Sequence, residues 1–338
     1  MKRIAINGLG RIGRATLKVV MDTPDFELIA VNDIIPSDEI VYLLKRDSVY
    51  GTYEKELEYQ KKEIKIDGKP ILKLSEKNPS QLPWKENEID IVFECSGLFT
   101  KQADMEKHLE AGAAHVIVSA PGKGEDIKFV IPGVNEPEAG DKLISTASCT
   151  TNCIAPVIEI LNRRIGIQKA IMTTIHAYTS SQSIVDSSNK NRRRGRAAAV
   201  NFVPTSTGAA KATSKVLKEM ENIFDGVAIR GPVPCGSIAD ITLVTRKDTS
   251  VEEINQIFKE ESNNRYKGVL AASEEDLVSS DIIKEPRVSV VDTGMTMVVD
   301  GNLVKVMSWY DNEWGYVNQM VKAGVMLSNK TDMVSQNA

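Results

Sequence analysis

The stretch Gly8-Leu9-Gly10-Arg11-Ile12-Gly13 predicts how the first part of the chain folds. The run Arg3 to Asn7 before it predicts a short buried strand, and the pattern after it predicts a helix that continues through Met21. A GxGxxG string between a strand and a helix is typical of a dinucleotide-binding turn. The alternative is a glycine-rich turn with no ligand. We therefore expect an α/β fold that binds a dinucleotide here.

Each glycine has its own task in this hypothesis. Gly8 allows the tight turn, Gly10 lets a pyrophosphate approach the backbone, and Gly13 permits close packing of helix on strand. The helix start faces the phosphates with its N–H groups. A second strand, 26–32, ends beside Asp33, and we expect this acid to bind the adenosine ribose hydroxyls.

Helix and strand patterns continue to alternate up to the middle of the chain. We expect helices over 37–44 and 101–111, a hairpin over 64–74 that turns at Asp67-Gly68, and strands over 90–93, 115–120 and 142–145. Cys95-Ser96-Gly97 follows one of these strands and suits a cofactor crevice. His108 and His115 have no metal-ligand spacing, so we interpret both as solvated or structural.

The heptapeptide Ala147-Ser148-Cys149-Thr150-Thr151-Asn152-Cys153 places a thiol at the start of another predicted helix. We expect Ser148 to cap this helix and Cys149 to lie in its first turn, where the helix dipole favours a thiolate nucleophile. The alternative is a buried core cysteine. Cys153 lies one turn further on, too far for an easy disulfide, and is interpreted as structural.

Composition limits the class of protein. The chain has 338 residues, 42% of them hydrophobic and 26% charged, which predicts a globular protein with two domains. Its four cysteines form neither a disulfide scaffold nor a zinc pattern, so we expect a reducing, cytoplasmic location. We find no export signal or membrane-spanning segment, and the net charge of -4 argues against nucleic-acid binding by the whole surface.

The second half adds basic groups. A strand over 168–179 carries His176 near its C-terminal end, where catalytic groups of α/β proteins collect. A polar segment follows, with arginines at 192–196 that we interpret as a loop presenting arginine to a phosphorylated substrate, near a neighbouring subunit. Residues 204–211 predict a Ser/Thr-rich turn into a helix, which is a second anion site, and Arg230 ends another strand.

Several long motifs together carry a family resemblance. INGLGRIGR, VNDI, ASCTTNC, MTTIHAYT, RAAAVNFVPTSTGAAKA, VAIR and SWYDNEWGY occur in this order, and the chain resembles the phosphorylating glyceraldehyde-3-phosphate dehydrogenases from end to end. The resemblance implies an α/β fold with a Rossmann doubly wound dinucleotide-binding domain (1–148) and an α+β catalytic domain with a mostly antiparallel sheet (149–312). It also implies an S-shaped loop around 178–200, a C-terminal helix (313–338) packing back on the first domain, and a homotetramer.

The resemblance also implies a reaction and its residues. Cys149 would attack the aldehyde of glyceraldehyde 3-phosphate, His176 would act as the base, and inorganic phosphate would release 1,3-bisphosphoglycerate from a thioester. The substrate and phosphate sites would use Ser148, Thr150, Thr179, Arg194, Thr207, Gly208 and Arg230. The cofactor site would use Asn7, Gly8, Gly10, Arg11, Ile12, Gly13, Asp33, Ser96, Gly97, Ser119, Ser188, Asn312 and Tyr316.

Three departures from the family pattern bear on the anion and cofactor sites. The chain has Thr179-Ser180-Ser181-Gln182 where the family usually has Thr-Asn-Asp-Gln, and it has Gly231-Pro232-Val233-Pro234-Cys235 where Val-Pro-Thr-Pro-Asn is frequent. It also has Asp186-Ser187-Ser188 where NAD-specific members commonly end in Leu-Pro. Asp33 would repel a 2′-phosphate and Ser188 of a neighbouring subunit could bind one, so we expect NAD use with NADP tolerated.

Alternative functions remain open on the sequence. Erythrose-4-phosphate dehydrogenases share the Cys and His motifs but usually depart from Thr-Ser-Thr-Gly-Ala-Ala-Lys-Ala, which is intact here. A non-phosphorylating aldehyde dehydrogenase would release an acid without phosphate. A catalytically inactive nucleotide-binding protein would lack Cys149 or His176. We expect no metal.

Overall fold

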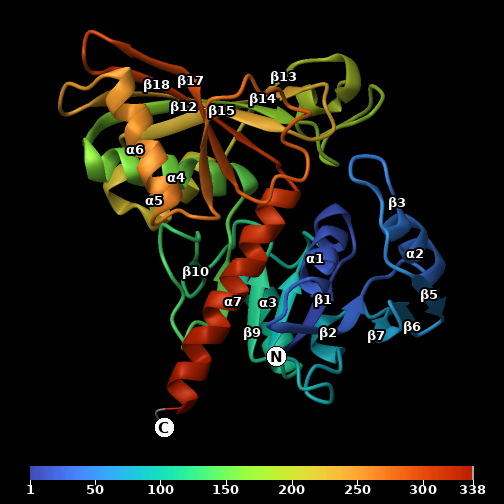
Figure 1. Ribbon diagram of the computed structural model, residues 1–338. Coiled ribbons are helices and arrows are strands. Elements are labelled where there is room, and N and C mark those ends of the chain that lie inside the picture. The colour runs from blue at the N-terminus through green and yellow to red at the C-terminus, as the bar shows by residue number, and fades with distance from the viewer. Residues whose placement is uncertain (337–338) are drawn as a thin grey trace. The chain divides into compact units, whose positions relative to one another are not determined.

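The structure, a computed structural model, describes residues 1–336 and the side chains of residues 1–334 (Figure 1). These residues form two compact units. The first comprises 1–130, 136–147 and the residues from Met320 onward, and the second comprises 131–135 and 148–319. Each unit builds its own sheet.

The described residues of the first unit contain a nine-stranded sheet in the order β10-β11-β9-β8-β1-β2-β7-β6-β5. Its strands are β1 (Lys2–Asn7), β2 (Phe26–Asn32), β5 (Leu57–Gln60), β6 (Glu63–Ile66), β7 (Lys69–Leu74), β8 (Ile91–Glu94), β9 (His115–Val118), β10 (Lys128–Phe129) and β11 (Leu143–Ser145). All neighbours from β10 to β7 are parallel, and β7-β6-β5 is an antiparallel meander. The predicted doubly wound sheet and the hairpin turning at Asp67-Gly68 are confirmed.

The helices of the first unit are α1 (Arg11–Met21), α2 (Ser37–Lys45) and α3 (Gln102–Glu110), and a two-stranded ribbon pairs β3 (Arg46–Asp47) with β4 (Gly51–Thr52). Ile4, Ala5 and Ile6 in β1 are completely buried, as expected for a parallel strand that is covered on both faces. A Cβ atom on Gly13 would collide with the carbonyl oxygen of Gly8. Gly13 therefore allows α1 to pack closely on the turn.

The described residues of the second unit contain a seven-stranded sheet in the order β13-β14-β12-β15-β18-β17-β16. Its strands are β12 (Ile167–Ala177), β13 (Val203–Ser206), β14 (Phe224–Gly231), β15 (Ser237–Thr245), β16 (Leu270–Ser273), β17 (Ser289–Val299) and β18 (Leu303–Tyr310). Only β12–β14 and β16–β17 pair in parallel within these described strands, so the expected mostly antiparallel sheet is confirmed.

Two local predictions in this unit need correction. The strand expected over 168–179 ends at Ala177, which leaves Thr179 in the following loop. Residues 203–206, expected as part of a turn, form the edge strand β13. An edge strand tolerates Pro204 because the missing N–H need not face a neighbour.

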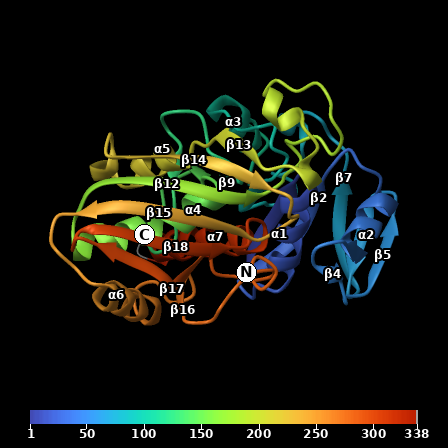
Figure 2. The same cartoon turned by 90° about the horizontal axis from the view of Figure 1, so that it is seen from above.

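The helices α4 (Cys149–Arg164), α5 (Ala209–Val216) and α6 (Val251–Asn263) gather on one face of this sheet (Figure 1). Ile158 and Leu161 of α4 pack in one buried cluster with Ile241 and Val304 of the strands. Figure 2 looks onto the opposite face, which no helix of the described second unit covers. Apolar side chains remain exposed there.

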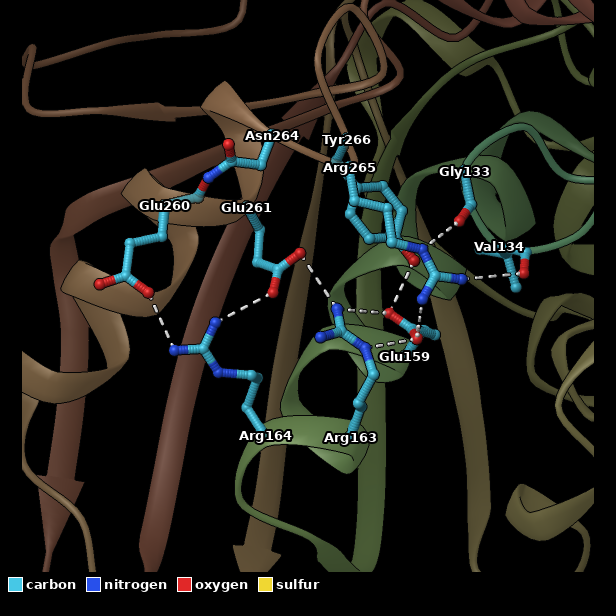
Figure 3. Close-up of polar contacts among 10 residues, drawn as sticks. All are labelled: Gly133, Val134, Glu159, Arg163, Arg164, Glu260, Glu261, Asn264, Arg265 and Tyr266. Carbon is cyan, nitrogen blue, oxygen red and sulfur yellow. Dashed lines mark hydrogen bonds and ion pairs between the residues drawn. The ribbon is translucent and has the colours of Figure 1, made fainter.

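Buried carboxylates anchor the C-terminal half of α4 (Figure 3). The Glu159 carboxylate accepts hydrogen bonds from Arg163 (2.8 Å), Arg265 (3.1 Å) and the Tyr266 hydroxyl (2.7 Å). Glu261 of α6 pairs with Arg163 at 3.0 Å and with Arg164 of α4. Arg265 also donates to the carbonyl oxygens of residues 133 and 134. These contacts hold α4 to α6 and to the segment 131–135.

Short 3₁₀ turns and a long terminal helix complete the described chain. The turns are Pro79–Gln81, Arg192–Gly195, Ala198–Val200 and Lys218–Met220. Helix α7 (Trp314–Gln336) begins in the second unit and continues in the first. The Asp311 carboxylate accepts hydrogen bonds from the N–H groups of Glu313 (2.8 Å) and Trp314 (2.7 Å), and so caps the start of α7.

Candidate active site

The start of α4 presents a cysteine. Ser148 is the residue before the helix, and its Oγ accepts a hydrogen bond from the Thr151 N–H at 3.2 Å. This satisfies one of the N–H groups that a helix start leaves without an intrahelical partner. Cys149 is the first helical residue and is partly exposed, whereas Cys153 is completely buried. The predicted cap and the first-turn cysteine are confirmed.

The end of β12 brings a histidine to this cysteine. His176 Nε2 lies 3.4 Å from Cys149 Sγ, although the two residues are 27 positions apart in the chain. His176 is 4% exposed, and its Nδ1 lies 2.7 Å from the carbonyl oxygen of Ala177. Nε2 thus faces the thiol, and the ring nitrogen that carries the hydrogen is set by the groups around Nδ1, which are the Ala177 oxygen and Arg230.

The surroundings keep both groups neutral. Burial raises the pKa of the Cys149 thiol, while the charge of Arg230 and hydrogen bonds at the helix start lower it, and the net direction is upward. Burial and the charge of Arg230 lower the pKa of His176 to about 3. Our expectation that the helix start would favour a thiolate is therefore wrong in net direction. At neutral pH the pair is a thiol beside a neutral imidazole.

Arg230, near the end of β14, lies against this pair. Its Nη1 is 2.5 Å from His176 Nδ1 and 3.0 Å from the Ala177 oxygen. Its Nε is buried and has no hydrogen-bond partner among the described residues. A buried donor of this kind is costly unless an acceptor reaches it. This observation fits the binding of an anion at Arg230.

A second arginine lies close enough to influence the same groups. The charge of Arg194 lowers the pKa of both His176 and Arg230. Arg194 is held by hydrogen bonds from its Nε to Thr205 Oγ1 (3.0 Å) and from its Nη2 to the Ser206 oxygen (3.4 Å). The structure thus brings two expected anion-binding arginines into the electrostatic field of the expected catalytic pair.

The remaining expected anion-binding residues lie at two helix starts and in a loop. Thr207 Oγ1 accepts a hydrogen bond from the Ala209 N–H at 3.2 Å, and Gly208 precedes α5. The Thr179 hydroxyl shares a 2.9 Å hydrogen bond with Ser181. Thr150 differs from these because its side chain is buried, so its hydroxyl is directed into the protein.

Tyr310 is a site residue that our sequence reasoning missed. Its hydroxyl bonds to Thr150 Oγ1 (2.9 Å) and to Thr174 Oγ1 (2.8 Å), and its ring packs edge-on against His176 with centroids 5.9 Å apart. It thus links the helix that carries Cys149 to the strand that carries His176. The SWYDNEWGY motif includes Tyr310, so the sequence pointed to this residue. Its contacts could not be predicted, because they depend on the pairing of β15 with β18.

Two further expected cofactor residues lie just after β18. The Asn312 Oδ1 atom accepts a hydrogen bond from Ser237 Oγ at 3.0 Å, which leaves its amide nitrogen as the end that can donate to a ligand. Tyr316, in the first turns of α7, is 3% exposed. Asn312 is thus held by the packing of the second unit.

In the first unit, the glycine turn has the form that a dinucleotide needs. Gly8 has φ +88°, and a Cβ atom there would collide with the backbone of Ser96. Gly10 precedes α1 without a side-chain cap, and a Cβ atom on it would meet no heavy atom of the described chain within 4 Å. The backbone at the start of α1 is therefore open to a phosphate. Asp33 accepts the Leu9 N–H at 2.5 Å, which ties the second strand to the turn.

Other expected cofactor residues surround this turn. Gly97 has φ +73°, and the Ser119 hydroxyl hydrogen-bonds to the thiol of Cys95. The Arg11 guanidinium pairs with Asp47 at 2.6 Å, so Arg11 offers its backbone N–H to a ligand more readily than its side chain. Ile12 follows it in the first turn of α1. Ser188 is exposed in the loop of the second unit.

Family models and known relatives match both units. The model described as "Glyceraldehyde 3-phosphate dehydrogenase, NAD binding domain" matches residues 2–102, and that described as "Glyceraldehyde 3-phosphate dehydrogenase, C-terminal domain" matches residues 148–312. The chain belongs to the glyceraldehyde-3-phosphate dehydrogenase family. Similar relatives are glyceraldehyde-3-phosphate dehydrogenase 2 of Streptomyces avermitilis, 45% identical over 97% of this chain and 99% of the relative, and glyceraldehyde-3-phosphate dehydrogenase of Thermotoga maritima, 46% identical over 95% and 97%.

Membership of the glyceraldehyde-3-phosphate dehydrogenase family bears on the reaction class and the cofactor. The chain is an oxidoreductase with an NAD-binding domain, as the matched models and relatives indicate. Among the residues that the structure describes, no group of three or more His, Cys, Asp or Glu side chains could hold a metal ion. Within the same residues, no helix has the length and apolar character needed to cross a membrane.

Proposed function

We propose that this chain oxidises glyceraldehyde 3-phosphate with NAD and inorganic phosphate to 1,3-bisphosphoglycerate. The observation that carries the proposal is the 3.4 Å contact between Cys149 Sγ and His176 Nε2 beside two arginines. The thiol supplies a nucleophile, the imidazole supplies a base, and the arginines suit a substrate and a co-substrate that both carry phosphate. Residues 1–148 would serve the cofactor and 149–312 the chemistry.

The first step needs a base at Nε2. Cys149 Sγ bonds to the aldehyde carbon, the carbonyl π electrons move to oxygen, and the thiol proton passes through His176 Nε2 to that oxygen. The product is a thiohemiacetal. Once Arg230 leaves Nδ1, Ala177 would support this step, because a hydrogen bond from Nδ1–H to its carbonyl oxygen would keep Nε2 unprotonated. An anion that engages Arg230 would withdraw the guanidinium from Nδ1 and favour this tautomer.

The second step is oxidation to a thioester. Bound NAD would supply the hydride acceptor for the hydrogen and electron pair that leave the thiohemiacetal carbon. His176 Nε2 takes the hydroxyl proton as the carbonyl forms. The thioester then undergoes attack by an oxygen of inorganic phosphate, the C–S bond breaks, and Cys149 regains its proton from His176. Because phosphate is the nucleophile, the acyl group leaves as an acyl phosphate.

The two anions need separate positions. We assign the substrate phosphate to Arg230 and Thr179, where a buried guanidinium Nε lacks a partner among the described residues. We assign the attacking phosphate to Arg194 with Thr207, Gly208 and Ser148, as the family motifs imply. Ser181 stands where the family usually has an acid, so the local positive charge is less compensated than in the usual pattern.

The cofactor of the family is NAD, and we expect NADP to be accepted in addition. Asp33 places a carboxylate next to the turn and would repel a ribose 2′-phosphate. Ser187 and Ser188 lie exposed in the loop and could donate hydrogen bonds to that phosphate from a neighbouring subunit. Comparable turnover with both cofactors would support this assignment. A thousandfold bias toward either cofactor would contradict it.

A homotetramer accounts for the uncovered face of the second sheet. Ile171, Val227 and Val299 are 62%, 50% and 58% exposed on the strands of this sheet, and exposed apolar patches mark association surfaces. We propose that this face contacts another copy in a cytoplasmic homotetramer. Sedimentation at micromolar concentration should give four times the 37.1 kDa chain mass. A monomer under the same conditions would contradict the proposal.

The function is tested by following NAD(P)H absorbance with glyceraldehyde 3-phosphate, with and without inorganic phosphate. We expect phosphate-dependent turnover that Cys149→Ser abolishes. Cys153→Ser is the matched control, because this second thiol of α4 is completely buried and its Sγ bonds to the Ser308 oxygen and not to His176, and we expect the variant to retain turnover. Phosphate-independent turnover or an active Cys149→Ser variant would refute the mechanism. Preferential oxidation of erythrose 4-phosphate would show that this aldehyde, and not glyceraldehyde 3-phosphate, is the substrate.

A further inference from the structure

A buried chain of hydrogen bonds lies beside the glycine turn of the first unit. The Trp84 indole Nε1–H donates to His108 Nδ1 at 3.0 Å, and His108 Nε2 lies 3.1 Å from Glu94 Oε2. All three residues are 0% exposed. An indole nitrogen can only donate, so Nδ1 must be the acceptor and the ring hydrogen must be on Nε2. His108 therefore donates to Glu94. Of the two interpretations of His108, solvated or structural, the structural one is confirmed.

The Glu94 carboxylate accepts hydrogen bonds from two segments next to the glycine turn, the end of β1 and the residues after β8. It accepts hydrogen bonds from Asn7 Nδ2 (2.5 Å), Ser96 N (2.7 Å) and Ser96 Oγ (2.5 Å), in addition to His108. Four donors match the four lone-pair positions of a carboxylate. Asn7 immediately precedes Gly8, and Gly8 packs directly on the backbone of Ser96. Glu94 thus ties Asn7, the residue before the glycine turn, to Ser96, on which Gly8 packs.

The chain continues across the sheet. Asn7 Oδ1 accepts a hydrogen bond from Asn32 Nδ2 at 2.7 Å, so both ends of the Asn7 amide are committed. Asn32 in turn exchanges hydrogen bonds of 2.8 Å with the backbone of Glu76. Glu94, Asn7 and Asn32 are the last residues of β8, β1 and β2, which are neighbours in the sheet. The network therefore holds the carboxyl edge of three adjacent parallel strands, where dinucleotides bind in such sheets.

We propose that Glu94 and His108 are positioning residues that preorganise this edge for NAD. The proposal rests on the proposed assignment of the cofactor to Asn7, Gly8 and Ser96. Neither Glu94 nor His108 need touch NAD, because they act through the Asn7 amide and the 95–97 turn. A site held in its binding geometry before the ligand arrives loses less free energy to ordering on binding. A network that served only the stability of the core would leave NAD affinity unchanged.

The test compares two variants of the full-length enzyme. Glu94→Gln keeps the shape but turns an amide NH₂ toward groups that also donate, so we expect the NAD Kd from calorimetry, without substrate, to rise at least tenfold. The KM for NAD should rise with it, while kcat at saturating NAD changes less than threefold. Trp84→Phe is the matched control, because it removes the remote donor of the same buried chain, and we expect its NAD Kd to stay within threefold of wild type.

Stability and spectroscopy complete the test. A Glu94→Gln enzyme that melts earlier but binds NAD within twofold of wild type overturns the proposal. If Glu94→Gln does not fold, His108→Gln decides by the same Kd criterion. Nitrogen NMR of wild type should show His108 protonated on Nε2 and not on Nδ1. The reverse would overturn the hydrogen-bond chain from Trp84 through His108 to Glu94. A wild-type enzyme that does not bind NAD would instead refute the proposed function.

Discussion

Replacing His176 with asparagine should remove a specific acid sensitivity from the protein. Burial and Arg230 lower the pKa of His176 from the usual 6.5 to about 3. A group whose pKa is lowered by folding contributes stability that is fully present above 6.5 and is lost as the pH falls toward 3. At pH 5.5 the unfolded chain gains about 1.4 kcal/mol from protonating this imidazole, against about 0.1 kcal/mol at pH 7.5. Wild type should therefore lose about 1.3 kcal/mol that His176→Asn does not lose.

Urea unfolding of both proteins at pH 7.5 and 5.5 measures this difference. The quantity of interest is the change in unfolding free energy between the two pH values, wild type minus variant, so the constant cost of the substitution cancels. Tyr310→Phe is the matched control, because it alters the same site and keeps the imidazole, and should retain the wild-type pH dependence. An equal loss of unfolding free energy in wild type and His176→Asn would refute the conclusion that folding buries His176 in its neutral form. The same variant should lose about 100-fold or more in kcat if Nε2 is the base.

Contacts in the structure support three further predictions. Glu159→Gln should lower the unfolding free energy by about 2 kcal/mol, because the buried Glu159 carboxylate receives four hydrogen bonds (Figure 3). Glu260→Gln is the control and should cost less than about 0.5 kcal/mol, because its partner Arg164 is solvent-accessible. Equal urea midpoints for the two variants would contradict this prediction. Tyr310→Phe should lower the unfolding free energy by about 1 kcal/mol and lower kcat several-fold with KM unchanged. Unchanged steady-state kinetics would show that Tyr310 has no role in the active site. Arg194→Gln should raise the KM for inorganic phosphate about tenfold or more. A larger rise in the KM for glyceraldehyde 3-phosphate would show that Arg194 binds the substrate phosphate and that our assignment of the two anion sites is reversed.

Local patterns were enough to predict most elements of the first unit. The strand before the glycines, the helix after them, the 26–32 strand and the 64–74 hairpin all depend on apolar periodicity and turn residues close in the chain. The strand 203–206 was missed because Pro204 and its Ser/Thr neighbours are typical of a turn. Its strand conformation depends on pairing with β14, which lies more than twenty residues further on.

The sequence by itself determined the dinucleotide-binding turn, the capped start of α4 and the identity of Cys149 and His176 as candidates. The tertiary structure decided their environment. Burial reverses the expected shift of the thiol pKa, Arg230 lies against His176, and Tyr310 bridges α4 and β12. In the first unit, Glu94 joins Asn7 to Ser96 beside the turn. The physical reason is that turns and caps depend on adjacent residues, whereas desolvation and buried hydrogen bonds depend on groups that folding brings together from distant parts of the chain.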